Sequence, residues 1–258
     1  MLVVGERING QFPNVSRAID SKDVKFIQAL AVEQVSGGAH LLDVNTGPGR
    51  DDGPEAMAWL VKTIQDAVDV RLCIDSPGLK TQQAGLSACR REPMINSTTA
   101  EQKRIEKFMP LAKEHNAELV CLTIDEKGIP NTIEGRTEVA MMLLASAMEH
   151  GIAPEKIYLD PVVLPISAAQ AQCPMLCEAL SSFKTLNDPP PKTIVGLSNV
   201  SSGAEERSLL NRTYLAMLLG RGLDAAIADP NDSELMKVVK AAEVLLNQRL
   251  YAASFLRA

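Results

Sequence analysis

The chain opens with Leu2-Val3-Val4-Gly5-Glu6-Arg7-Ile8-Asn9-Gly10, in which a short apolar run leads directly into polar residues. A run of this kind is typical of a parallel strand that is buried on both faces. An open, doubly wound sheet usually follows its first strand with the glycine pattern G-x-G-x-x-G. That pattern is absent from this stretch. The opening therefore favours a parallel sheet that is not of the doubly wound kind.

The same arrangement recurs along the chain, because short apolar runs alternate with longer amphipathic stretches. The expected strands are Leu2–Val4, Leu41–Val44, Val70–Ile74, Pro93–Ile95, Glu118–Thr123, Lys156–Leu159, Lys192–Leu197 and Asp224–Ala228. The expected helices are Asp23–Ser36, Pro54–Ala67, Leu79–Ala88, Ala100–Asn116, Arg136–His150, Pro174–Leu186, Leu209–Leu219 and Ser233–Asn247. Eight such units in 258 residues predict an α/β protein with one (β/α)8 TIM barrel, which needs roughly 250 residues.

Helix-end signals support this division of the chain. Prolines stand near the expected starts at Pro54 and Pro174, and glycines follow the expected ends at Gly151 and Gly220. These are the positions that helices favour for the two residue types. No linker or low-complexity segment interrupts the alternation. We therefore expect residues 1–258 to form a single barrel domain.

Composition and charge exclude several classes of protein. Apolar residues make up 46% and charged residues 22%, which are ordinary values for a globular chain. Lysine and arginine total 26 against 32 acidic residues, so the formal charge is −6. An acidic chain with 3% aromatic residues is not expected to bind nucleic acid. It also lacks an apolar run of the roughly 18 residues that would span a membrane.

The cysteine and histidine pattern bears on location and on metals. The five cysteines form no Cys-x-x-Cys pair, and the chain opens without a basic leader segment. We therefore expect reduced thiols and a cytoplasmic location. The histidines have no metal-ligand spacing, so we expect neither a bound metal nor a tightly held cofactor.

The most informative pattern is the polar residue type found where the strands end. Each expected strand finishes in, or runs directly into, an acidic, amide or hydroxyl side chain: Glu6 with Asn9, Asp43 with Asn45, Asp75, Asn96, Thr123, Asp160, Ser198 with Asn199, and Asp229. One such residue is most simply a turn or helix cap. In a barrel, however, all these points share one rim. The repetition therefore predicts a polar binding mouth.

The predicted mouth offers carboxylates and amides but few strong bases or nucleophiles. A carboxylate accepts two parallel hydrogen bonds from a pair of N–H groups, and an asparagine supplies one donor and one acceptor. Such a site suits a neutral heterocycle that is rich in N–H donors. The 2-amino-4-oxo edge of a pterin fits this description.

Several of these stretches together resemble the pterin-binding barrel family. The resemblance is carried by Val4–Gly10, Leu42-Asp43-Val44-Asn45, Ile74-Asp75-Ser76, Met94-Ile95-Asn96-Ser97, Leu159-Asp160-Pro161, Gly196–Ser201, Asn211-Arg212-Thr213 and Leu223–Asp229. Members of the family include dihydropteroate synthase, the folate module of cobalamin-dependent methionine synthase, and methyltetrahydrofolate:corrinoid/iron–sulfur protein methyltransferase. The last two motifs and the stand-alone length are most similar to the last of these.

The resemblance implies a barrel that binds methyltetrahydrofolate and passes its N5-methyl group to Co(I) of a corrinoid on a separate corrinoid/iron–sulfur protein. By motif position, Asp75, Asn96 and Asp160 would hold the pterin ring, Asn199 would approach N5, and Arg207 would lie near the p-aminobenzoate or glutamate portion. Asn199, Asp160 and Asp75 would carry the catalysis. Glu6, Asn9, Asp43 and Asn45 would form a supporting polar layer, and Ser198 and Ser202 complete the expected substrate-binding set.

The resemblance also frames the alternatives. Ser202 stands where relatives carry a longer amide, which puts a direct contact from this residue in question. A dihydropteroate synthase would handle a pyrophosphate leaving group and would call for lysine and arginine at the mouth, whereas the seventh strand ends in Leu197-Ser198-Asn199 without a lysine. A folate-binding protein without turnover is the third reading. The family further implies a homodimer that works in one-carbon metabolism, in the acetyl-CoA pathway.

Overall fold

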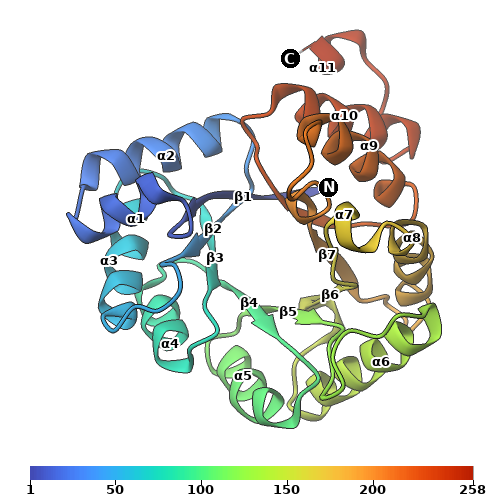
Figure 1. Ribbon diagram of the computed structural model, residues 1–258, viewed down its shortest axis with the longest axis horizontal. Helices are drawn as coiled ribbons and strands as arrows, with labels where there is room; N and C mark the ends of the chain where they lie inside the picture. Colours follow the sequence, from blue (N-terminus) through green and yellow to red (C-terminus); the bar gives the residue numbers. More distant parts are fainter. Residues whose placement is uncertain (258) are drawn as a thin grey trace.

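The computed structural model describes residues 1–257, with side chains through Phe255. Its strands pair in parallel with their neighbours in sequence, and the first pairs with the last, so the sheet closes into a barrel (Figure 1). The strands are β1 (Leu2–Asn9), β2 (Leu41–Asn45), β3 (Arg71–Asp75), β4 (Met94–Thr98), β5 (Glu118–Leu122), β6 (Ile157–Asp160), β7 (Lys192–Gly196) and β8 (Ala225–Ala228). This closed parallel barrel confirms the predicted (β/α)8 fold.

Helices surround the barrel on its outside (Figure 1). They are α1 (Pro13–Asp20), α2 (Val24–Ser36), α3 (Gly53–Gln65), α4 (Leu79–Ala88), α5 (Gln102–Glu114), α6 (Ile133–Glu149), α7 (Ile166–Ala169), α8 (Gln172–Phe183), α9 (Arg207–Leu219), α10 (Ser233–Leu245) and α11 (Ala253–Arg257). Two 3-10 turns, η1 (Pro154–Lys156) and η2 (Leu197–Asn199), accompany β6 and β7. Each expected strand and each expected helix has a counterpart within a few residues.

The sequence prediction missed α1, which follows β1 directly. The helix has Pro13 at its first position, and its N-cap residue Phe12 makes no side-chain cap hydrogen bond. Val15, Ala18 and Ile19 are buried, which is the i, i+3, i+4 spacing of an amphipathic helix. The proline and this spacing were therefore the available signals, although the usual polar cap was missing.

The first strand is longer than the sequence prediction and contains an irregularity. Gly5 pairs with Leu42 but Ile8 pairs with Val44, so β1 carries one more residue than β2 across this interval. A bulge of this kind re-aims side chains at the rim of a sheet. Gly5 is required here, because a Cβ atom on it would lie 2.5 Å from Oε1 of Gln34. The same Oε1 accepts a hydrogen bond from the Arg7 amide nitrogen at 2.8 Å.

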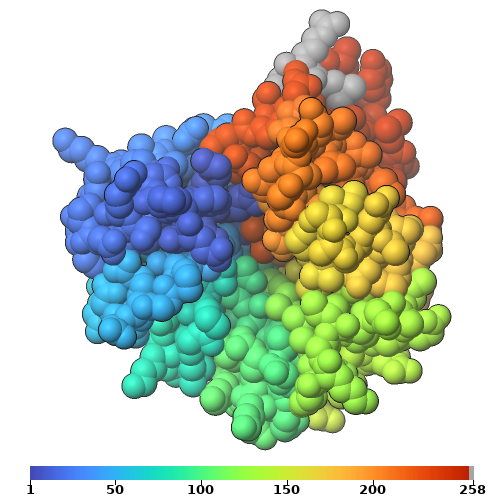
Figure 2. All heavy atoms as spheres, in the orientation of Figure 1, coloured from blue at the N-terminus to red at the C-terminus, as the bar shows by residue number. Residues whose placement is uncertain are grey.

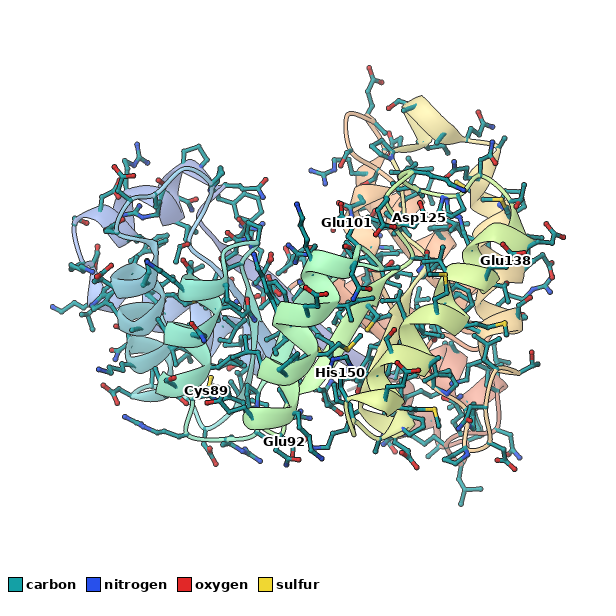
Figure 3. The ribbon with its side chains drawn as sticks, turned by 90° about the horizontal axis from the view of Figure 1, so that it is seen from below. Cys89, Glu92, Glu101, Asp125, Glu138 and His150 are labelled. Atoms are coloured by element: carbon teal, nitrogen blue, oxygen red, sulfur yellow. The ribbon has the colours of Figure 1, made fainter. Side chains whose placement is uncertain are left out.

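The barrel interior is filled below the strand ends. A buried apolar cluster occupies it, with one buried side chain from each strand: Val4, Leu41, Cys73, Met94, Val120, Tyr158, Ile194 and Ala225. At the amino end, Glu118 forms ion pairs with Arg71 at 2.6 Å and with Lys192 at 2.9 Å. These layers close that end, so a ligand reaches the interior from the carboxyl end. Figure 3 shows the two ends, with Glu101 and Asp125 near the carboxyl rim and Cys89 and Glu92 opposite.

Two larger apolar clusters lie between the barrel and its helices. One packs α1 through α6 and α8 against β1 to β6, and the other packs α8, α9 and α10 against β7 and β8. Among the described residues, no helix combines the length and the hydrophobicity that crossing a bilayer would need. The described cysteines are all free thiols.

Candidate active site

A cavity of about 490 Å³ opens at the carboxyl ends of the strands. Figure 2 shows this face hollowed near its centre, between the blue N-terminal segment and the yellow segment of α7. Almost every residue of the predicted site lines the cavity: Glu6, Asn9, Asp43, Asp75, Asn96, Asp160, Ser198, Asn199, Ser202 and Arg207. The barrel thus brings together residues that are dispersed over most of the chain.

Asn45 is the exception, because it lies behind the cavity wall. Its Nδ2 donates a hydrogen bond of 2.7 Å to Oδ2 of Asp75. Its Oδ1 accepts a hydrogen bond from the Gly47 amide at 2.6 Å. Asn45 therefore fixes the carboxylate of Asp75 and the loop after β2. The sequence analysis expected Asn45 in a supporting polar layer of the site, and the structure places it beside Asp75 and outside the cavity lining.

A second amide–carboxylate pair lies beside the first. Nδ2 of Asn96 donates a hydrogen bond of 3.0 Å to Oδ1 of Asp43. Asp43 is buried, and this burial together with the neighbouring Asp75 raises the pKa of Asp43 well above its ordinary value. Burial also raises the pKa of Asp75, while the hydrogen bond from Asn45 lowers it. The two adjacent strands β2 and β3 thus present an acidic pair held by two asparagines.

Asp160 closes the opposite side of the cavity at the end of β6. Its Oδ1 accepts a hydrogen bond of 2.7 Å from the amide of Val162. Val162 has a φ of 65°, in the left-handed region that strains a β-branched residue. This strained turn aims the amide at the carboxylate. Burial raises the pKa of Asp160 to about 7, although the Val162 hydrogen bond and the charge of Arg136 lower it.

Glu6 projects from the bulged part of β1 toward the end of β7. Ser198 donates a hydrogen bond of 2.8 Å from its hydroxyl to Oε1 of Glu6. Burial raises the pKa of Glu6 to about 7, with a smaller contribution from Asp229. Ser198, Arg7 and Arg207 act in the opposite direction. Glu6 is therefore a second carboxyl group of the cavity that titrates near neutral pH.

The positive charges of the cavity lie on one side only. Arg7 follows Glu6 and pairs with Asp229 at 3.5 Å. Arg207 begins α9, and its Nε donates a hydrogen bond of 3.2 Å to the hydroxyl of Ser201. Ser202 lies nearby, and its hydroxyl donates a long bond of 3.5 Å to the Ser198 carbonyl. An anionic part of a ligand is therefore favoured on the side of β1 and α9.

Asn199 differs from the other asparagines of the site because its side chain is exposed. Among the described residues it has no side-chain hydrogen-bond partner, and its Nδ2 rests 2.9 Å from where a Cβ of Gly196 would stand. It ends η2, whereas α9 begins eight residues later with Glu206 as its N-cap. Asn199 therefore caps no α-helix, and its amide is free to turn into the cavity.

The sequence analysis missed several residues that line the cavity, chiefly Arg7, Gln11, Phe12, Ser97 and Val162. Arg7 and Gln11 were visible signals, because each is a polar residue two positions from Asn9. A smaller cavity of about 280 Å³ shares Asp75, Asn96, Ser97 and Leu122 with the first and adds Arg104. Within residues 1–257, no group of three or more histidine, cysteine or acidic side chains has the arrangement to hold a metal ion.

Known proteins share both the sequence pattern and the fold. The sequence profile of the family described as "Pterin binding enzyme" matches residues 5–229. A methylcorrinoid:tetrahydrofolate methyltransferase of Eubacterium limosum is 32% identical, over 97% of this chain and 93% of its own length. A methionine synthase of Mycobacterium leprae is 31% identical over 88% of this chain, which spans 20% of that protein.

Solved structures agree at the level of the fold. A dihydropteroate synthase of Yersinia pestis superposes with a TM-score of 0.70 at 16% identity, over 95% of this chain and 93% of that one. A dihydropteroate synthase of Xanthomonas albilineans gives 0.69 at 16% identity, over 97% and 93%. The sequence match, the barrel and the polar cavity agree, and this chain belongs to the pterin binding enzyme family.

Proposed function

We propose that this chain is a methyltransferase that moves a methyl group between N5 of tetrahydrofolate and the cobalt of a corrinoid. The observation that carries the proposal is the joint placement of Asp75, Asn96, Asp160 and Asn199 around one cavity. The relative from Eubacterium limosum, which matches nearly end to end, supports it. The corrinoid is a substrate here, and we propose that a separate corrinoid/iron–sulfur protein carries it.

Pterin recognition follows from the two sides of the cavity. Asp160 and Asp75 lie on different strands and accept N–H groups of the flat ring, while Asn96 supplies a donor and an acceptor. A charged acceptor makes a stronger hydrogen bond than a neutral one. The anionic p-aminobenzoyl-glutamate portion then extends toward Arg207 and Arg7, on the side where the positive charges lie.

The reaction needs help at N5, because a tertiary amine is a poor leaving group. When Co(I) attacks, the bond between the methyl carbon and N5 breaks and a carbon–cobalt bond forms. The cobalt becomes Co(III), and N5 keeps the electron pair and gains a proton. Asn199 donates a hydrogen bond to N5 that strengthens in the transition state. Glu6 and Asp160 titrate near neutral pH, so either carboxyl group is able to exchange the proton through water.

The direction of net transfer is not fixed by the site. The name of the Eubacterium limosum protein gives methylcorrinoid and tetrahydrofolate as its substrates, which is the reverse of the direction that the sequence resemblance implied. In that direction N5 attacks the methyl group, the carbon–cobalt bond breaks with its electron pair left on cobalt as Co(I), and N5 releases its proton. The same side chains serve both directions by microscopic reversibility. We therefore propose that the transfer is reversible. We also propose that the protein acts as a homodimer.

Dihydropteroate synthase activity is the alternative on the same fold. Its pyrophosphate leaving group would call for a cluster of cations. The residues that line the cavity include the two arginines Arg7 and Arg207 but no lysine, and they include four carboxylates. This charge balance disfavours a phosphorylated substrate and favours the methyltransferase.

Parallel product assays test the proposal. The protein is incubated with methylcobalamin and tetrahydrofolate, and separately with a pterin diphosphate and p-aminobenzoate, and the products are identified by mass spectrometry. We expect methyltetrahydrofolate in the first reaction and no dihydropteroate in the second. Dihydropteroate formation would establish the alternative, and binding of methyltetrahydrofolate without any turnover would indicate a folate-binding protein.

A further inference from the structure

Arg136 has a position that is unfavourable for a cation in two respects. Its side chain is 0% exposed, so the guanidinium is removed from water. It also lies one turn into α6, close to the helix N-terminus, where the helix dipole disfavours positive charge. Glu138, only two residues further along, is exposed on the outer side of the same helix (Figure 3). A buried cation in this place requires compensation by an opposite charge.

Local contacts supply only part of that compensation. Nη2 of Arg136 donates a hydrogen bond of 2.8 Å to Oε1 of Gln172, the first residue of α8. Its Nε and Nη1 are buried and have no hydrogen-bond partner among the described residues. Within the same part of the chain, no carboxylate forms an ion pair with Arg136. The neutral amide of Gln172 is therefore its direct partner.

Asp160 is the acid whose charge reaches Arg136. α6 packs on β6, and Asp160 ends that strand with its carboxylate toward the cavity. The interaction is mutual, because Asp160 stabilises the charged form of Arg136 and Arg136 lowers the pKa of Asp160. The hydroxyl of Tyr214 also faces Arg136, but it donates its hydrogen bond to the Cys173 carbonyl.

The other ionisable groups around Asp160 do not replace Arg136. The strands on either side, β5 and β7, carry Glu118, Cys121 and Lys192, and Glu118 pairs with Lys192 at the amino end of the barrel. Tyr158 on β6 bonds to the same pair. The remaining groups lie across the cavity and are Glu6, Arg7, Asp43, Asp75 and Arg207. Arg136 is thus the cation that acts on Asp160 from behind the wall.

We infer that Arg136 is a positioning residue for the pterin site, whose buried guanidinium favours the ionised form of Asp160, the hydrogen-bond acceptor for the N–H groups of the ring. The inference rests on the proposed function, which places the pterin against Asp160. It adds a residue that contacts neither substrate and lies outside the cavity. Burying the cation costs folding free energy, and its positive charge favours the ionised acceptor that binds the substrate.

Titration of Asp160 in the ligand-free protein tests the electrostatic part. Carboxyl-carbon NMR of protein with labelled aspartate follows the pKa of Asp160, with Asp160→Asn to assign its signal. We expect Arg136→Met to raise this pKa by about one unit, because an opposite charge nearby shifts a carboxyl by one unit or more. Arg136→Lys keeps the charge and is expected to leave the pKa close to that of the wild type.

Gln172→Glu is the second variant, and it retains the arginine in case Arg136→Met does not fold. The new carboxylate would replace the amide oxygen that accepts the hydrogen bond from Arg136, so its negative charge would neutralise the guanidinium locally. We expect it to raise the pKa of Asp160 in the same direction. Arg212→Met, which breaks a pair between α9 and Asp232, the N-cap residue of α10, is the matched control and is expected to leave the pKa of Asp160 unchanged. An unchanged Asp160 pKa in folded Arg136→Met or Gln172→Glu would overturn the inference.

The pH profile of methyltetrahydrofolate binding, measured by calorimetry, tests the link to substrate. We expect Arg136→Met to move the midpoint upward by about one pH unit, which weakens binding about tenfold at a fixed pH below it. The shift should vanish in an Asp160→Asn background. A uniform loss of affinity at every pH would indicate a merely structural role and would overturn the inference. Failure of the wild type to bind the folate would refute the proposed function instead, and the NMR titration would then decide the inference alone.

Discussion

Ser198 donates a hydrogen bond of 2.8 Å to Glu6 and so joins the first strand of the barrel to the end of the seventh, across 192 positions of sequence. The bond forms where the barrel closes, beside β8. It orients the carboxyl group of Glu6, whose pKa is raised to about 7 by burial. Asn199 follows Ser198 directly. The same turn therefore presents a titratable group and the proposed N5 donor to one region of the cavity.

The first prediction concerns the stability of the folded protein between pH 5 and pH 8. The folded-state pKa of Glu6 is about 7 against an ordinary value of 4.5, so the folded protein holds a proton that the unfolded chain has released. The contribution of Glu6 to the free energy of unfolding is therefore fully present below about pH 4.5, and it is lost as the pH rises through about 7. Glu6→Gln removes this contribution. We expect the variant to lose less unfolding free energy across this pH range than the wild type, by at most about 3 kcal/mol. Denaturant unfolding at a series of pH values measures the difference.

Two variants serve as controls for this prediction. Ser198→Ala removes the hydrogen bond that lowers the pKa of Glu6, so it should steepen the decline. Glu205→Gln changes an exposed carboxylate and should leave the curve unchanged. If the free energy of unfolding of Glu6→Gln falls with pH as steeply as that of the wild type, Glu6 does not titrate in this range.

The second prediction concerns Asp160 as a pterin acceptor. Removing a charged partner from a buried hydrogen bond costs about 1.5–3 kcal/mol. Asp160→Ala should therefore weaken binding of methyltetrahydrofolate by about tenfold or more, measured by calorimetry on protein shown to be folded by circular dichroism. Asp125→Ala, on the same rim but outside the cavity lining, is the control. Wild-type affinity in the Asp160 variant would exclude the assignment.

The third prediction separates binding from catalysis at Asn199. Its side chain has no hydrogen-bond partner among the described residues and caps no helix, so its loss should leave thermal stability nearly unchanged. A donor that acts mainly in the transition state affects the rate more than the affinity. Asn199→Ala should slow single-turnover methyl transfer by about 10- to 1000-fold at saturating folate. A near-normal rate would remove Asn199 from the catalytic set.

The fourth prediction concerns the proposed corrinoid protein. Exposed acids surround the mouth, among them Asp51, Asp52, Glu205 and Glu206, and Asp52 is partly neutralised by Arg50 at 2.9 Å. A partner that docks over this rim should associate through attraction to these exposed charges, which dissolved salt screens. We expect the second-order transfer rate to fall as ionic strength rises, and to fall less in Glu205→Gln with Glu206→Gln. A rate that is independent of salt would argue against electrostatic docking.

The sequence predicted the barrel because its local signals agree with its global topology. Short apolar runs followed by amphipathic stretches allow few closed arrangements of this length. The site followed from the same topology, because parallel strands place Asp75, Asn96, Asp160 and Asn199 on one rim whatever the details of each loop. The residue types at the strand ends were visible without any knowledge of their contacts.

The remaining features depend on long-range packing that no local pattern carries. Glu6 was expected at a strand end, yet it lies within β1 because a bulge against β2 extends the strand to Asn9. Asn45 carries the same polar signal as its neighbours but bonds sideways to Asp75. Arg136 reads as an ordinary helix residue, and its complete burial results from how α6 and α8 meet over β6.

The most direct measurement is an absorbance assay of methyl transfer with a free corrinoid. The protein is mixed with methyltetrahydrofolate and cob(I)alamin under anaerobic conditions, and separately with methylcobalamin and tetrahydrofolate, while the Co(I) and methyl-Co(III) bands are followed. The account predicts protein-dependent formation of one methyl-Co(III) for each methyl group transferred in the first mixture, the reverse change in the second, and slower change in both mixtures with Asn199→Ala. Unchanged cobalt spectra in both mixtures, with protein that binds methyltetrahydrofolate, would contradict it.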